Sequence, residues 1–182
     1  GSYLDLLVLA GRLFGRADWL WAGTGGRDGT PPAERCGSFP LGGYFFQRSH
    51  WAPDAECARY LIFDCGPLGD GGHGHYDALH VEVVANGRAL LADPGRYTYH
   101  EETPNWRRWF KGTAAHNTVC VDGLDQTPYR RGKPRGPAAV ARLLFRRTTP
   151  SLDVLCGEVR SPVYETVHTR LILFVAGEYW IV

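Results

Sequence analysis

The chain has 182 residues, which fits one domain of ordinary size and is long enough to bury a hydrophobic core. Its 20 lysines and arginines nearly balance 19 aspartates and glutamates, and the formal charge of +1 excludes a global field that attracts nucleic acid or an anionic membrane. No run of about 18 apolar residues occurs, so the sequence predicts no membrane span.

The cysteines have no CxxC spacing. An odd number without close pairs argues against a zinc knuckle and against a fully paired disulfide framework. We therefore interpret most of them as buried small apolar residues, while one disulfide that involves Cys36, Cys57 or Cys65 stays open. The five are Cys36, Cys57, Cys65, Cys120 and Cys156.

Residues 3–14 have the pattern of one amphipathic helix, because their apolar residues recur at helical spacing. Residues 22–32, AGTGGRDGTPP, are rich in helix breakers and predict an exposed connection. A boundary is expected there. It divides the chain into a helical segment at 1–21, a linker at 22–37 and a second unit at 38–182.

The second unit has the sequence pattern of an all-β, antiparallel β-sandwich, with short apolar or alternating runs separated by Gly, Pro, Asn and Asp. Ala85-Asn86-Gly87-Arg88 predicts a tight hairpin, since Asn and Gly both tolerate positive φ. The predicted strands are 43–48, 60–64, 79–84, 89–92, 117–121, 139–147, 152–159, 166–174 and 178–182.

Three separate segments carry side chains suited to a metal ion. His73-Gly74-His75 puts two imidazoles on one side of an extended backbone, since side chains at i and i+2 share a face. Asp93 follows the predicted hairpin, and His116 opens the next predicted strand. Two nitrogens and one oxygen with an open fourth position are what a zinc site with an exchangeable ligand needs.

Structural roles compete with this hypothesis. A histidine at a strand end is more often hydrogen-bonded than metal-bound, and Asp93 before Pro94-Gly95 is also a typical turn residue. His80 and Glu82 alternate with apolar neighbours, which predicts that they line the wetter face of a strand.

Residues 105–111, NWRRWFK, mix cations with aromatic rings. Guanidinium groups hold carboxylate or sulfate, and aromatic faces stack on sugar rings, so an acidic sugar is the expected ligand. Single-stranded nucleic acid is the competing ligand, but the neutral overall charge argues against it. The predicted substrate-binding residues are Trp106, Arg107, Arg108 and Trp109.

The runs HGHYDALHVEVVANGRALLADPGRYTY and WRRWFKGTAAHNTVCVDGLDQ resemble the heparinase II/III-like module of bacterial polysaccharide lyases. That family joins an α/α-toroid to a C-terminal β-sandwich. The resemblance implies that residues 1–21 hold the terminal helix of a toroid domain that this chain lacks, and that residues 38–182 are a truncated sandwich.

Carried over residue by residue, the resemblance implies a Zn²⁺ ion on His75, Asp93 and His116, and a catalytic role for His73 as base or in neutralising the uronate. Asp77 is either an acceptor that orients an imidazole or a loop cap. Family members often have a tyrosine where this chain has Trp109, so no hydroxyl is available there.

The implied reaction is β-elimination on an acidic polysaccharide: the proton α to the uronate carboxylate is removed and the 4-linked glycosidic oxygen leaves. In the family, the acid/base tyrosine and an asparagine lie on the toroid, so the fragment alone is expected to be inactive. A periplasmic or secreted location is expected. The alternative is a non-catalytic carbohydrate-binding or interface module.

Overall fold

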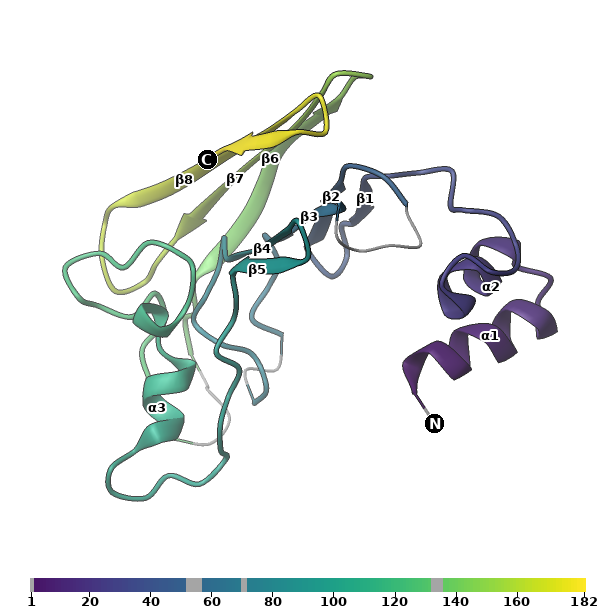
Figure 1. Cartoon of the computed structure of the whole chain (residues 1–182). Coiled ribbons are helices and arrows are strands. Elements are labelled where there is room, and N and C mark those ends of the chain that lie inside the picture. The colour runs from purple at the N-terminus through teal and green to yellow at the C-terminus, as the bar shows by residue number, and fades with distance from the viewer. Residues whose placement is uncertain (1, 52–56, 70–71, 132–135) are drawn as a thin grey trace.

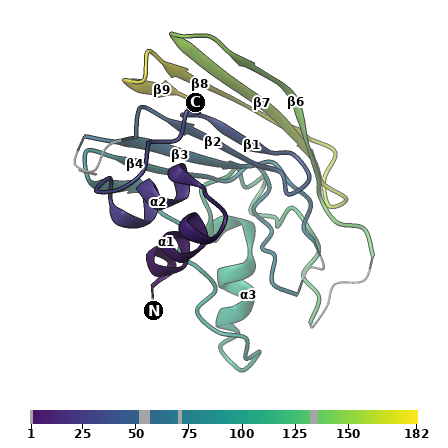
Figure 2. The ribbon, with the colours of Figure 1, turned by 90° about the vertical axis from the view of Figure 1, so that its right-hand side faces the viewer.

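The computed structural model describes residues 2–51, 57–69, 72–131 and 136–182. Two antiparallel sheets lie one over the other (Figures 1 and 2), which confirms the predicted β-sandwich. The first sheet has the order β1 (Gly37–Phe39), β2 (Tyr44–Arg48), β3 (Arg59–Asp64), β4 (Val81–Ala85) and β5 (Arg88–Leu91). The second has the order β6 (Val140–Thr148), β7 (Leu152–Arg160), β8 (Val167–Val175) and β9 (Tyr179–Ile181).

The core lies between the sheets, because alternate side chains of each strand point inward. In β3 and β4 every second residue is buried. Gly157 of β7 keeps the two layers close, since a Cβ there would lie 2.7 Å from Cys65 Sγ and 3.0 Å from Phe63 Cζ. The buried cluster comprises Phe45, Leu61, Phe63, Cys65, Leu79, Val81, Val83, Leu155, Val159 and Ile172.

The predicted hairpin at residues 85–88 is confirmed. β4 and β5 pair antiparallel with Ala85 opposite Arg88, and the two turn residues have positive φ, 52° at Asn86 and 71° at Gly87. Both values suit the tight turn whose twist matches that of the strands. The hairpin returns the chain toward the loops that precede β4.

Two helices precede the sheets, where the sequence predicted one. α1 (Tyr3–Leu13) begins with a capping box between Ser2 and Asp5, and α2 (Ala17–Thr24) continues into the segment interpreted as linker. The glycine there serves packing: a Cβ on Gly23 would lie 2.8 Å from the backbone nitrogen of Val8, so the two helices approach closely. They lie on the side of the first sheet away from the second (Figures 1 and 2).

Residues 117–121 do not form the predicted strand. Their polar groups bond to distant backbone instead: Asn117 Nδ2 donates to the Ala92 carbonyl at 3.0 Å, and Thr118 Oγ1 donates to the Ala78 carbonyl at 2.7 Å. The structure adds three short elements that the sequence did not predict. They are β1, α3 (Trp106–Lys111) and the 3₁₀ turn η1 (Thr113–Ala115).

All five cysteines lie in the described part of the chain and are free, so the disulfide left open by the sequence does not form. Cys65 and Cys156 are buried as expected of small apolar residues, whereas Cys57 is exposed. None of the helices among the described residues is long and apolar enough to span a bilayer.

Candidate metal centre and the cavity beside it

Asp93 is positioned by the hairpin and by its own turn. It follows β5, and its Oδ1 accepts a hydrogen bond from the Gly95 backbone N–H at 2.7 Å. Asp93 is therefore both a turn residue and a member of the site, because its other oxygen, Oδ2, points to His116, whose Nδ1 lies 2.6 Å away.

His116 follows η1 and its side chain is fully buried. Its Nε2 lies 3.0 Å from the carbonyl oxygen of Phe110 in α3. The preceding turn, η1, is held in place by Thr113. Its Oγ1 donates to the Tyr76 carbonyl at 2.6 Å and accepts from the Gln126 N–H at 2.8 Å. The ring of His116 is thus held at both nitrogens, by Asp93 and by the Phe110 carbonyl, while Thr113 fixes the turn that precedes it.

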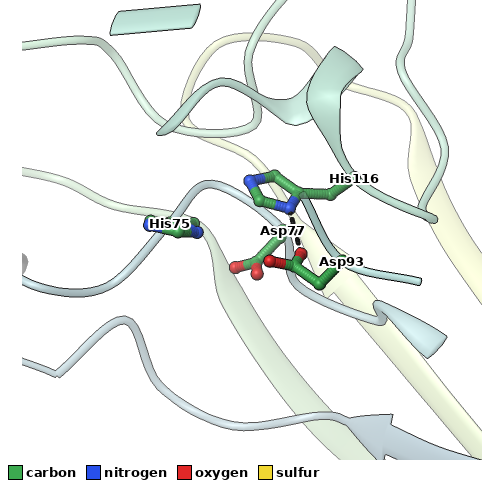
Figure 3. A group of neighbouring side chains, drawn as sticks. All are labelled: His75, Asp77, Asp93 and His116. Atoms are coloured by element: carbon green, nitrogen blue, oxygen red, sulfur yellow. Dashed lines mark hydrogen bonds and ion pairs between the residues drawn. The ribbon is translucent and has the colours of Figure 1, made fainter. Parts of the chain in front are cut away.

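His75 completes the group from the other side. Its ring stacks on that of His116 at a centroid distance of 4.8 Å and an interplanar angle of 28°. One ligand atom from each of His75, Asp77, Asp93 and His116 lies within 4.8 Å of the others (Figure 3). The structure thus brings together the three residues singled out in the sequence and adds Asp77 to them.

The donor set suits a zinc ion. Neighbouring donors of a tetrahedral zinc site lie about 3.3–3.6 Å apart, given bond lengths of about 2.0–2.2 Å, so only small side-chain movements separate this cluster from such a site. The Phe110 carbonyl accepts a hydrogen from Nε2 of His116, which leaves Nδ1 as the nitrogen for a metal.

The charges of the cluster are coupled. Burial lowers the pKa of His75 to about 4, with the neighbouring His116 acting in the same direction, so His75 is neutral at pH 7. Burial acts to raise the pKa of Asp93, but the hydrogen bonds from His116 and Gly95 outweigh it and hold that pKa at about 2. Burial acts to lower the pKa of His116, and the hydrogen bond to Asp93 and the charge of Asp77 reverse this and raise it.

His80 also belongs to this region, although the sequence predicted that it lines a wetter face. It is only 5% exposed, and its Nε2 lies 3.6 Å from Asp93 Oδ2. β4 begins at Val81, so His80 is still in the preceding turn, where Leu79 has a φ of 64°. The inward and outward alternation of strand residues therefore starts after His80 and does not predict which way its side chain points.

His73 lies outside the cluster of four, because the backbone from 72 to 75 is not the extended strand expected from its i and i+2 spacing. Its ring contacts Tyr99, with Nδ1 2.6 Å from the hydroxyl oxygen. His73 and His75 nevertheless share the wall of one cavity of about 490 Å³, together with Tyr44, Asp64 and Asp77. Spacing alone did not identify Tyr99.

The aromatic and basic run forms α3, which is capped by Asn105, whose side chain accepts from the Arg108 N–H at 2.9 Å. Trp106 and Trp109 are 48% and 53% exposed. Arg107 is buried, and its Nη2 donates to the Gly72 carbonyl at 2.7 Å. The sequence predicted substrate contact for all four residues from 106 to 109, but the buried Arg107 instead holds the loop that leads into His73.

Residues 31–182 match the family described as heparinase II/III-like, C-terminal. A heparin-sulfate lyase of Bacteroides stercoris is 28% identical over 164 residues, which cover 87% of this chain and 22% of that protein. A heparin-sulfate lyase of Pedobacter heparinus is 25% identical over 162 residues, with the same coverage of 87% and 22%.

The crystal structure of heparan sulfate lyase HepC from Pedobacter heparinus has the same fold, with a TM-score of 0.80 at 23% identity over 97% of this chain and 26% of that one. This chain therefore spans about a quarter of the length of the relatives it matches. The family match over most of the chain, together with the β-sandwich, shows that the chain belongs to the heparinase II/III-like family and corresponds to its C-terminal domain.

Proposed function

We propose that this chain is the β-sandwich portion of a zinc-containing polysaccharide lyase that cleaves uronate-containing acidic polysaccharide by β-elimination. Two relatives are named heparin-sulfate lyases, which supports this substrate class. The proposal is carried by one combination: the cluster of His75, Asp93 and His116 lies beside His73, which shares a cavity wall with His75.

In this proposal His75, Asp93 and His116 hold the zinc ion, and Asp77 supplies a further oxygen at the same point. When bound, the ion would serve as a clamp on three loops, since elimination requires no water nucleophile. The chain's own residues prepare this role: the Phe110 carbonyl orients the His116 ring, and the Gly95 N–H orients the Asp93 carboxylate.

His73 is the proposed catalytic base of the chain. The proton α to the uronate carboxylate moves to the base, and the electron pair of that C–H bond forms a carbon–carbon double bond. The bond to the 4-linked glycosidic oxygen breaks, and this oxygen leaves with the bonding pair and takes up a proton. The α proton is weakly acidic, so the carboxylate must be neutralised while the base acts. The exposed Trp106, Arg108 and Trp109 of α3 are the proposed sugar contacts.

The remaining catalytic groups are proposed to come from an α/α-toroid domain of the same protein. The resemblance assigns an acid/base tyrosine and a carboxylate-neutralising asparagine to that domain. Such a division accords with the chain's 22% share of the length of its heparin-sulfate lyase relatives. The chain by itself is therefore expected to bind metal without appreciable lyase activity.

Elemental analysis tests the metal site. Purified wild-type chain is expected to contain about one zinc per chain, and both His116→Ala and Asp93→Asn are expected to lose it. Asp93→Asn preserves the size of the side chain, which separates loss of a ligand from loss of folding. His100→Ala, which removes an exposed histidine outside the cluster, is the control. A metal-free wild type that folds normally contradicts the zinc assignment.

The lyase reaction is tested in the full-length enzyme by following the ultraviolet absorbance of the unsaturated uronate. His73→Ala is expected to lower the rate at least about 100-fold, the contribution typical of a general base. Retained glycan binding without any product from the wild-type enzyme would favour the non-catalytic binding module instead.

A further inference from the structure

The contact between His73 and Tyr99 joins two loops that are 26 residues apart in sequence. Tyr99 Oη lies 2.6 Å from His73 Nδ1, and the two rings meet edge to face at a centroid distance of 5.5 Å. A hydrogen bond of this length fixes both the rotation of the imidazole and the nitrogen that it occupies.

Tyr99 is itself contacted by two arginines. The Arg96 guanidinium lies 3.5 Å from the centroid of its ring and the Arg107 guanidinium 4.8 Å from it. The chain enters this position through a tight turn at Tyr97, where φ is 57° and the Thr98 N–H donates to the Arg96 carbonyl at 2.6 Å. A non-glycine residue keeps this backbone conformation only where surrounding contacts hold it there.

Arg107 connects the same tyrosine to the backbone of the His73 loop. Its Nη2 donates to the carbonyl of Gly72, the residue before His73, and its Nε lies 3.7 Å from Glu101 Oε1. One buried arginine thus contacts both the ring that bonds His73 and the main chain that carries His73. His73 and Tyr99 are both exposed, and this shared arginine means that their meeting does not rest on the hydrogen bond alone.

We propose that Tyr99 is the positioning residue of His73: it occupies Nδ1, so that Nε2 is the ring nitrogen available to the substrate. This inference rests on the proposed lyase function and specifies its geometry. A base needs a free electron pair on Nε2, so the neutral ring must carry its hydrogen on Nδ1 and donate it to the Tyr99 oxygen. When Nε2 takes the substrate proton, the same hydrogen bond supports the imidazolium that forms.

The test uses Tyr99→Phe, which removes one hydroxyl and keeps the ring that both arginines contact. Tyr97→Phe is the matched control, because Tyr97 lies two residues away, stacks on Phe110 and is 72% exposed. Spectra of the ¹⁵N-histidine-labelled chain report the tautomer of His73, and His73→Ala assigns the signals. The wild type and Tyr97→Phe are expected to hold the Nδ1–H form, while Tyr99→Phe shifts the population toward Nε2–H.

In the full-length enzyme, Tyr99→Phe is expected to lower kcat about 10- to 100-fold with little change in KM, as is typical when a partner that orients a functional histidine is lost. Tyr97→Phe should leave both constants unchanged. Unchanged His73 signals or an unchanged kcat in Tyr99→Phe overturns the proposal.

The spectra and the kinetics separate this proposal from the function on which it rests. If the wild-type chain holds His73 as Nε2–H and Tyr99→Phe alters that form, Tyr99 still positions the ring, but His73 is a hydrogen-bond donor and the base role is wrong. If the wild-type enzyme makes no unsaturated product, the lyase function fails while the spectra still decide the Tyr99 contact.

Discussion

His80 reaches the same carboxylate that holds His116. Its Nδ1 accepts the Asn117 N–H at 3.0 Å, so the hydrogen of the neutral ring sits on Nε2, which lies 3.6 Å from Asp93 Oδ2. Burial lowers the pKa of His80 to about 4, which keeps the ring neutral at pH 7. The neutral ring thus lies beside Asp93, at a distance longer than a hydrogen bond, and adds no second cation there.

We expect His80→Ala to weaken zinc binding about 10- to 100-fold although no proposed ligand is removed, because the space beside Asp93 that the ring fills then lets the carboxylate turn. Competition against a chromogenic chelator measures this affinity, and circular dichroism checks that the variant is folded. His100→Ala serves as the control for loss of a histidine. Equal affinities for His80→Ala and wild type would show that Asp93 does not need this neighbour.

Asp64, at the end of β3, is a partly buried carboxyl with a raised pKa. Burial and then the charge of Asp77 raise its pKa to about 6. The folded state therefore keeps a proton that the unfolded chain, with a pKa of about 3.9, releases. Unfolding releases this proton between about pH 4 and 6, so the contribution of Asp64 to stability falls as pH rises through that window.

Asp64→Asn removes this ionisation and keeps the oxygen that accepts the Gly66 N–H at 2.9 Å. We expect the variant to gain stability relative to wild type as pH rises from 4 to 7, by at most about 3 kcal/mol, the value of two pKa units. Urea unfolding at each pH measures the difference. A difference that stays constant across the window means that the carboxyl is not held protonated by the fold.

At the scale of the elements, the segment that enters β2 and the segment that leaves β3 approach each other closely, and this approach depends on glycine. Gly43, just before β2, has a φ of 76°, and a Cβ there would lie 1.9 Å from the Cα of Gly66. Backbone cannot move aside as a flexible side chain can, so the two segments cross only because neither has a side chain. This crossing forms part of the cavity wall that also includes His73 and Asp64.

Gly43→Ala is expected to lower the free energy of unfolding by about 3–5 kcal/mol, since it combines backbone strain with a steric clash. Gly69→Ala is the matched control: its φ is 68°, and a Cβ there meets nothing within 4 Å. We therefore expect Gly69→Ala to lose only about 1–2 kcal/mol of unfolding free energy, the cost of the left-handed backbone conformation. Chemical denaturation of both variants measures the two losses, and equal losses would rule out the clash.

Elements with strong local signals were predictable from the sequence, whereas those set by distant contacts were not. Asn86-Gly87 specifies its hairpin through the backbone freedom of two residues, so no knowledge of the rest of the chain was needed. α3 has only six residues and depends on its Asn105 cap, a local signal that coincides with the aromatic and basic run predicted to bind sugar. The run at 117–121 has strand-like residues, but its hydrogen bonds go to Ala78 and Ala92.

The same distinction holds for the site. Motif spacing singled out His75, Asp93 and His116, and the fold brings them within reach of one another. Tyr99 and His80 contribute through contacts that span 26 and 13 residues and that follow no periodic pattern. Such contacts depend on how the loops pack over the sandwich, which residue spacing does not encode.

At the scale of the whole molecule, the second sheet supports the loops of the site through Arg170 of β8. Its Nη1 donates to the carbonyl of Leu79 and to that of Asn117, the latter at 2.8 Å. These two residues adjoin His80 and His116. Burial lowers the pKa of Arg170, yet it remains a cation at neutral pH, so both contacts are charge-assisted hydrogen bonds.

Arg170→Met keeps much of the packing volume and removes both bonds, so two carbonyls lose their donor. We expect a loss of about 2–4 kcal/mol in unfolding free energy, together with weaker zinc binding because the loop that carries His116 is released from β8. Arg142→Met, in the same sheet, is the control: Arg142 is 65% exposed in its side chain and pairs with Glu158 at 2.9 Å. Because Arg142 is exposed and Arg160 also pairs with Glu158 at 3.1 Å, the loss in this control is expected to be at most about 1 kcal/mol. If the two variants lose equal stability and retain equal zinc affinity, the second sheet does not brace the site, and the metal cluster depends on the first sheet and its loops alone.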